Sequence, residues 1–172
     1  QNVKRYKNGL IRTQDTHFTA ERPYLIYDSL VISPNITLNI DPGVTFYMHD
    51  TAKVITYGTL LAKGTRENPI VFRGDRLDFI LNDILPYDRT PSQWGGIFFR
   101  PESYHNIMDN VIVRNGQTGL TFEKSSPDES TLKLSNSQIT NMGEHLFSAR
   151  NFKIDVTNTD LTHAGGRVVV MI

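Results

Sequence analysis

Short apolar runs of two to five residues, separated by Gly, Asn or Pro, recur along this chain of 172 residues. In the last third one phrase occurs three times: an Asn, an aliphatic residue three positions later, Asn or His five positions later, and a closing Gly. The copies begin at Asn110, Asn136 and Asn158, so the steps between them are 26 and 22 residues. Two apolar tracks repeat with the same steps, namely Met108, Leu134 and Val156, and Leu120, Leu146 and Val168. Three tracks with one period indicate a repeating structural unit.

The first half of the chain has the same period. Residues 54–62 overlay residues 32–40 at a shift of 22, and residues 70–72 overlay residues 44–46 at a shift of 26. The four extra residues lie around positions 65–69, where we expect a turn, because turns tolerate insertions.

Two repeat architectures have periods in this range, the leucine-rich repeat and the parallel β-helix. The chain has neither the fixed run of leucines nor the helical segment that a leucine-rich repeat requires. We therefore predict an all-β fold, a right-handed parallel β-helix with coils of about 22–26 residues, in which like residues stack at roughly 4.8 Å. Enrichment in Asn, Thr, Ile, Val and Gly is typical of short strands and turns.

The repeated Asn and His positions are best explained by the coil itself. Asn is a common turn residue, and stacked amides can bond along the axis of a β-helix. We expect Asn115, Asn141 and His163 to stack and bond at one corner, and we interpret the whole set as a structural ladder rather than a ligand site. Its members are Asn110, Asn136, Asn158, Asn115, Asn141 and His163.

The pattern also predicts the organisation of the chain. Residues 1–22 are polar and weakly periodic, and we expect them to pack as a leader on the first coil. Residues 23–172 form the β-helix domain. Its last strand, residues 167–172, has no obvious cap, so the domain is either a truncated part of a longer solenoid or is covered there by another copy. Residues 74–91 fit no rung and predict one long loop insertion; loops of that length are often functional.

Composition narrows the function. Eighteen basic and eighteen acidic residues give zero formal charge, which excludes the electrostatic footprint of a nucleic-acid binder. There is no Cys, so neither disulfides nor thiolate metal sites are available. No apolar run approaches the roughly 20 residues of a transmembrane helix. Because the chain begins with Gln1 rather than Met, we expect a targeting segment to have been removed.

Several phrases resemble right-handed parallel β-helix repeat proteins, and in particular the exported lipoprotein-type members from Bacteroidetes. These phrases are ITLNIDPGVTF at 36–46, GTLLAKGTRENPIVF at 58–72, FRGDR at 72–76, PYD at 86–88 and QWGGI at 93–97. The resemblance covers the chain from about Pro23 onward. It implies a β-helix at the cell envelope or outer-membrane surface, and it brings no catalytic set.

The insertion contains the candidate ligand-binding residues, which are Asp75, Arg76, Asp78, Tyr87, Asp88, Arg89 and Trp94. Carboxylates beside aromatic rings are typical of carbohydrate recognition. A glycoside hydrolase would need two carboxyl groups roughly 5–9.5 Å apart, one with a raised pKa. A lyase would need a base and a cation that neutralises the uronate.

A structural interpretation of the same residues stands beside the functional one. Asp75 would pair with Arg76 and Asp88 with Arg89, and so pin the insertion over the sheet. The apolar residues Phe79, Ile80, Ile84 and Leu85 would pack underneath, and Trp94 would pack in the core.

No cofactor is predicted. The five His residues have no metal-ligand spacing, and the Asp-rich insertion is the one argument for calcium, since no calcium-binding repeat is present. The leading hypothesis is a non-enzymatic cell-envelope scaffold that presents a side face and the 74–91 insertion to a glycan or protein partner. One alternative is a carbohydrate-active enzyme, a lyase or hydrolase using the insertion carboxylates. Another is a module that assembles end to end, as a homo-oligomer, through its uncapped C-terminal coil.

Overall fold

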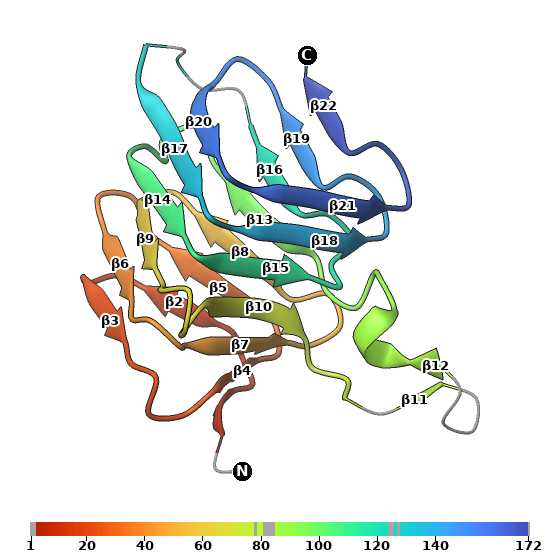
Figure 1. Ribbon diagram of the computed structural model, residues 1–172. Coiled ribbons are helices and arrows are strands. Elements are labelled where there is room, and N and C mark those ends of the chain that lie inside the picture. Colours follow the sequence, from red (N-terminus) through yellow and green to blue (C-terminus); the bar gives the residue numbers. More distant parts are fainter. Residues whose placement is uncertain (1–2, 78, 81–84, 124–125, 127, 172) are drawn as a thin grey trace.

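A computed structural model describes residues 3–77, 79–80, 85–123, 126 and 128–171. These residues form a parallel β-solenoid of about seven turns, in which three parallel sheets run along the stack (Figure 1). The predicted all-β parallel β-helix is therefore confirmed.

Each turn of the solenoid contributes one strand to each sheet, except that the turn with β21 and β22 has no strand in sheet III among the described residues. Sheet I contains β1 (Lys4–Tyr6), β4 (Tyr24–Ile26), β7 (Thr45–Met48), β10 (Ile70–Gly74), β15 (Val111–Arg114), β18 (Gln138–Met142) and β21 (Asp160–Ala164). Sheet II contains β2 (Leu10–Arg12), β5 (Ser29–Ile32), β8 (Lys53–Thr56), β13 (Gly96–Phe99), β16 (Leu120–Phe122), β19 (Phe147–Ala149) and β22 (Val169–Met171). Sheet III contains β3 (Thr16–Phe18), β6 (Thr37–Ile40), β9 (Thr59–Lys63), β14 (Asn106–Asp109), β17 (Ser130–Ser135) and β20 (Lys153–Thr157).

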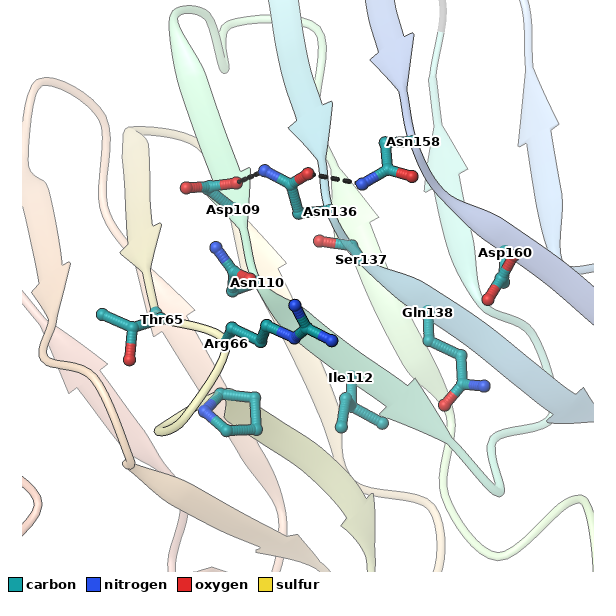
Figure 2. Close-up of a pocket in the computed structure, with 12 residues that line it drawn as sticks. Thr65, Arg66, Asp109, Asn110, Ile112, Asn136, Ser137, Gln138, Asn158 and Asp160 are labelled. Carbon is teal, nitrogen blue, oxygen red and sulfur yellow. Dashed lines mark hydrogen bonds between the residues drawn. The ribbon is translucent and has the colours of Figure 1, made fainter.

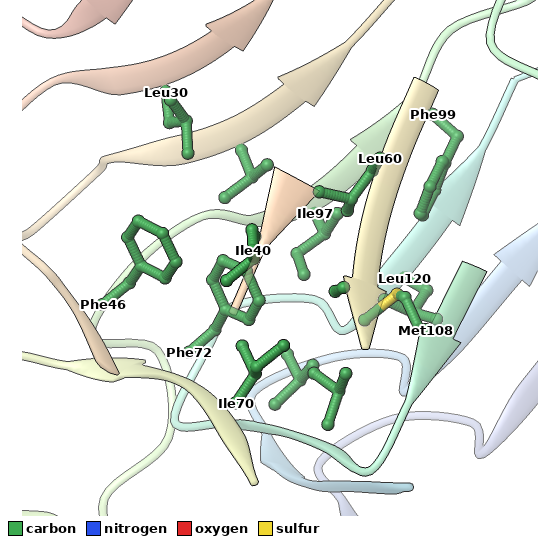
Figure 3. Packing of buried hydrophobic residues seen from close by; sticks show 14 of the residues in the cluster. Leu30, Ile40, Phe46, Leu60, Ile70, Phe72, Ile97, Phe99, Met108 and Leu120 are labelled. Atoms are coloured by element: carbon green, nitrogen blue, oxygen red, sulfur yellow. The ribbon is translucent and has the colours of Figure 1, made fainter. Parts of the chain in front are cut away.

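The core lies inside the coil, because alternate residues of each strand point inward. In β6 the inward residues Leu38 and Ile40 are buried, whereas their neighbours are partly exposed. Like residues stack on successive turns: the rings of Phe46 and Phe72 lie 4.8 Å apart and nearly parallel, at 6°. Figure 3 shows these rings among the aliphatic side chains that fill the interior. Burying one such side chain contributes about 1.5–3 kcal/mol to folding.

The predicted register is confirmed on the central tracks. Met108 pairs with Leu134 and Leu134 with Val156, and Phe46 pairs with Phe72. Two predicted pairings are wrong. Leu120 pairs with Phe147 rather than Leu146. Arg114 pairs with Thr140, and Leu120 follows Arg114 by six positions, whereas Phe147 follows Thr140 by seven.

The second error lies earlier in the chain. Val54 pairs with Leu30, not with Ile32, because four residues connect β5 to β6 but two connect β8 to β9. The strands thus keep register while the corners vary in length. A constant sequence shift therefore predicts the wrong pairing partner once the two repeats being aligned differ in corner length.

The first 22 residues were expected to pack as a leader on the first coil, but residues 4–18 form a turn of the solenoid themselves. The strands β1, β2 and β3 pair in parallel with β4, β5 and β6, beginning with Lys4 opposite Tyr24. Few of their positions are buried, most of the others are polar, and Ile11 is apolar but exposed, so the apolar periodicity of this turn is weak.

The insertion leaves the sheets on either side undisturbed. β10 pairs with β15, so Ile70 lies opposite Val111 although the two residues are 41 positions apart in the sequence. On the neighbouring turn, the paired residues of β7 and β10 are 26 positions apart. Within the described residues the insertion holds an antiparallel pair, β11 (Phe79–Ile80) with β12 (Leu85–Pro86), followed by the 3-10 helix η1 (Tyr87–Arg89). This segment projects from the side of the stack in Figure 1.

The repeated Asn and His positions are corners with left-handed backbone. Their φ angles are 50° at Asn110, 48° at Asn136, 43° at Asn158, 66° at Asn115, 59° at Asn141 and 58° at His163. Asn tolerates this conformation better than other residues with a Cβ atom. The phrase therefore repeats because the turn repeats.

Candidate functional site: the outer face of sheet I

The outer surface of sheet I is bounded by two segments that project from the solenoid, and we call it the sheet I face. Two columns of outward side chains run along its C-terminal half. One consists of Ile112, Gln138 and Asp160, which pair across β15, β18 and β21. The other consists of Arg114, Thr140 and Thr162. The turn formed by residues 64–69 lies at one margin, and the 74–91 insertion lies at the other.

At the first margin is an open groove of about 980 Å3, which we call the side groove. It exists because six residues, 64–69, connect β9 to β10, whereas on the following turns one or two residues make the same corner. Figure 2 shows Arg66 from this turn reaching over Ile112, with Gln138 and Asp160 farther along the sheet. The extra residues that the sequence placed in a turn thus form the wall of the groove.

A row of hydrogen-bonded side chains lines the far side of the groove (Figure 2). Asp109 Oδ1 accepts hydrogen bonds from Ser135 Oγ at 2.7 Å and from Asn136 Nδ2 at 2.8 Å. Asn136 Oδ1 accepts one from Asn158 Nδ2 at 2.7 Å. On the track that begins each repeated phrase, one axial amide–amide hydrogen bond thus joins Asn136 and Asn158, and the row ends on Asp109, the neighbour of Asn110.

The ladder expected at Asn115, Asn141 and His163 takes a different form. The residues just before them, Arg114, Thr140 and Thr162, pair in register, but within the described part of the chain no hydrogen bond joins the side chains of Asn115 and Asn141. Asn115 is buried, and its Nδ2 donates to the carbonyl oxygens of Asp88 at 2.7 Å and Thr90 at 3.2 Å. This Asn holds the insertion instead of its axial neighbour.

Asp109 is the carboxylate that organises the row. Burial raises its pKa, but hydrogen bonds donated by Ser135, Asn136 and Asn110 outweigh burial, and the pKa is lowered from its ordinary value. Asp109 is therefore ionised at neutral pH and suited to accept hydrogen bonds rather than to donate a proton.

Other polar groups of the groove remain available to a ligand. The side chains of Arg66, Gln138 and Asp160 are exposed, and among the described residues they have no hydrogen bond or ion pair. They offer one guanidinium, one amide and one carboxylate on a single surface. Sequence reasoning missed all of them, because neither the outward strand positions of Gln138 and Asp160 nor the turn position of Arg66 has a periodic signal.

At the second margin the insertion is fastened to the sheet by Asp88. Its Oδ1 lies 2.8 Å from Arg73 Nη2 and 3.0 Å from Arg114 Nη2, so one carboxylate oxygen pairs with arginines from two adjacent strands. Gln93 Nε2 adds hydrogen bonds to the carbonyl oxygens of Tyr87 and Thr90.

The charge of this cluster is not fully balanced. The pKa of Arg73 is lowered first by burial and then by the positive charge of Arg114, and Asp88 opposes both effects. Two guanidinium groups thus share one carboxylate on the sheet I face.

A smaller hollow of about 320 Å3 separates the insertion from the corner after β7. Here Asp75 Oδ2 lies 2.6 Å from His49 Nδ1, and the guanidinium of Arg76 lies over the ring of Tyr87 at 3.7 Å. The expected pairing of carboxylates within the insertion is thus replaced by pairing to the solenoid, for both Asp75 and Asp88.

The other candidate residues are placed as follows. Trp94 is 1% exposed and its Nε1 donates to the carbonyl oxygen of Arg114 at 2.8 Å, so it packs in the core and presents no surface for a sugar. Arg89 is exposed. Asp78 lies outside the described residues, as do the side chains of Phe79, Ile80, Ile84 and Leu85, whose packing stays a prediction.

Across the described ranges, no group of three or more His, Asp or Glu side chains is positioned to share a metal ion. The same ranges contain no helix with the length and apolar character to cross a membrane.

The fold and the site define a parallel β-solenoid with a polar side face. No family model matches the chain, and no solved structure matches it. A segment of 68 residues, 40% of the chain, is 38% identical to the protein named Protein bark beetle from Drosophila melanogaster. That segment covers 2% of the fly protein, so the likeness is local and transfers no activity.

Proposed function

We propose that this chain is a non-enzymatic β-solenoid module that binds a glycan through the sheet I face. The observation that supports it best is the side groove, where polar side chains repeat on consecutive turns. The 74–91 insertion bounds the same face and would contact the ligand or a protein partner that carries it.

The chemistry of the groove suits sugar hydroxyl groups. Amide and carboxylate groups both accept hydrogen bonds from hydroxyls, and amide and guanidinium groups donate to them. Gln138 and Asp160 occupy neighbouring strands, so their Cα atoms are separated by roughly 4.8 Å along the stack. Pro69 and Ile112 add apolar surface against which the C–H face of a sugar ring packs.

The pKa of one carboxyl group and the ion pairs of two others support binding without catalysis. A glycoside hydrolase needs one carboxyl group with a raised pKa, whereas the pKa of Asp109 is lowered. Asp75 and Asp88 are engaged in ion pairs with His49 and with Arg73 and Arg114. Depolymerisation of a polysaccharide that is abolished by Asp75→Asn or Asp88→Asn would contradict the proposal.

The proposed location is the cell envelope or outer-membrane surface, as for exported lipoprotein-type proteins of Bacteroidetes. This part rests on the sequence phrases that resemble such proteins. Detection of the native protein by antibody on intact cells would test it, and exclusive recovery from the cell interior would contradict it.

Glycan-array binding of the chain tests the function directly. We expect Gln138→Ala and Asp160→Ala to weaken binding, because each removes an exposed group of the side groove. Asn39→Ala is the matched control, because Asn39 is an outward residue on sheet III, in β6. Equal losses for all three variants would place the ligand elsewhere.

A further inference from the structure

We infer that the sheet I face selects uncharged glycans and rejects polyuronates, and that Asp88 is the residue that enforces this selection. The inference rests on the proposed glycan-binding function and assigns its ligand class. It follows from how the charges of the face are already paired.

The sheet I face contains a potential anion site. Arg73 and Arg114 occupy register-matched outward positions on β10 and β15, since Phe72 pairs with Val113 and the next residue on each strand is the arginine. Two guanidinium groups on adjacent strands suit a carboxylate or sulfate, because arginine donates several hydrogen bonds to such oxygens. Left open, this pair would attract a uronate.

The chain fills that site with its own carboxylate. Asp88 Oδ1 lies within 3.0 Å of both arginines, and the two arginine side chains are 12% and 30% exposed. The backbone around Asp88 is held in place by hydrogen bonds from Asn115 and Gln93 to the carbonyl oxygens of residues 87, 88 and 90. A ligand carboxylate would have to displace the Asp88 carboxylate, which is 44% exposed but stands on a backbone that is held in place.

The side groove adds no net positive charge. The side groove is lined by one cation, Arg66, and two anions, Asp109 and Asp160. A polyuronate would therefore meet an excess of negative charge along the groove and an occupied arginine pair at its margin. A neutral glycan carries no charge and does not meet this repulsion.

The test compares two polymers, a neutral β-glucan and polygalacturonate, in binding isotherms at low and at physiological salt. For the unmodified chain we expect the β-glucan to bind at least about tenfold more tightly, because like charges at an interface oppose association. Asp88→Asn leaves Arg73 and Arg114 without their counter-ion. We expect the variant to gain at least about tenfold in polygalacturonate affinity relative to β-glucan, with a gain that weakens in salt.

Three further variants complete the design. Arg114→Gln added to Asp88→Asn should cancel the gain, because it removes half of the arginine pair. Asp160→Asn should shift the affinity ratio in the same direction without touching the insertion, which keeps the test valid if Asp88→Asn folds poorly. Asp155→Asn makes the same change of net charge on sheet III, at an exposed position of β20, and should leave the ratio unchanged.

The outcomes separate the two proposals. If neither polymer nor any array glycan binds, the proposed function fails and this inference fails with it. If polygalacturonate binds as tightly as β-glucan, the inference is overturned while glycan binding stands. Failure of Asp88→Asn to alter the ratio in folded protein would overturn the role of Asp88, and failure of Asp160→Asn would overturn the role of the groove charge.

Discussion

At the scale of the residue, Asn115 links the solenoid to its insertion. Its backbone is left-handed, and its buried amide donates to two carbonyl oxygens of the insertion. We expect Asn115→Ala to lower the free energy of unfolding by about 2–4 kcal/mol, since it strains the corner and leaves buried carbonyls without donors. Asn35→Ala is the control: Asn35 has a φ of 61° but is exposed, so the loss should be about 1–2 kcal/mol. Equal losses in urea titrations would mean that the two hydrogen bonds contribute nothing.

A second residue-scale prediction concerns the pKa of Asp109. Because this pKa is lowered in the folded protein, Asp109 stabilises the fold above its unfolded pKa of about 3.9, and the contribution is lost as pH falls through the lower folded value. Asn136→Ala removes one donor and should raise the pKa toward its ordinary value, as measured by NMR titration of the carboxyl carbon.

Asn158→Ala is the control for that titration. Asn158 bonds to Asn136 and not to Asp109, so its removal should move the pKa less. A larger shift in the control than in Asn136→Ala would show that the row is coupled in another way.

Single residues also mark the limit of sequence reasoning. The recurrence of Asn indicated turns correctly, but the left-handed backbone at these residues was not predicted from the sequence. Which amides bond to one another depends on where the corner points each side chain. Asn136 reaches Asn158, whereas Asn115 turns to the insertion, and no feature of the repeated phrase distinguishes them.

At the scale of the element, strand β13 shows the difference between inward and outward positions. Phe99 is 1% exposed, and its ring stacks on Phe122 at 4.6 Å and 3°. We expect Phe99→Ala to lower the free energy of unfolding by about 3–5 kcal/mol, measured in denaturant. Phe98 is its neighbour and points outward over Lys53, so Phe98→Ala should cost about 1 kcal/mol or less. Similar costs would contradict the assigned register of β13.

The elements were predictable where the interior dictates them. Apolar residues at alternate positions indicated the strands from β4 onward, and the broken period indicated the insertion. β1 to β3 were missed because a turn at the end of the stack buries few residues. The register errors at Val54 and Leu120 arose from corner lengths, which the apolar pattern does not encode. The side groove could not be predicted from the apolar pattern for a related reason, since it is formed by a turn that is longer than the equivalent turns on the following coils.

At the scale of the whole molecule, the stack should be least stable at its ends. In a solenoid each turn contacts its neighbours, and a turn with one neighbour has half the interface. Within the described part of the chain, β20, β21 and β22 have one neighbour each, and Val156, Val168 and Met171 are largely exposed. We expect amide hydrogen exchange to be fastest in these strands and slowest in β7, β8 and β9.

Hydrogen–deuterium exchange at several protein concentrations would check this. Protection of β20 to β22 that rises with concentration would contradict the prediction for the single chain and would support end-to-end assembly through this coil. Protection that is equal in all turns and independent of concentration would contradict both.

The left-handed corners have a consequence for how such a chain changes over time. Their lengths vary from one turn to the next while the strands on either side stay in register. The insertion shows the extreme, since β10 and β15 pair directly across it. New segments can therefore be inserted at a corner without a compensating change in the buried core of the solenoid. Binding surfaces can evolve, or be grafted by design, one corner at a time on a scaffold that does not need to be rebuilt.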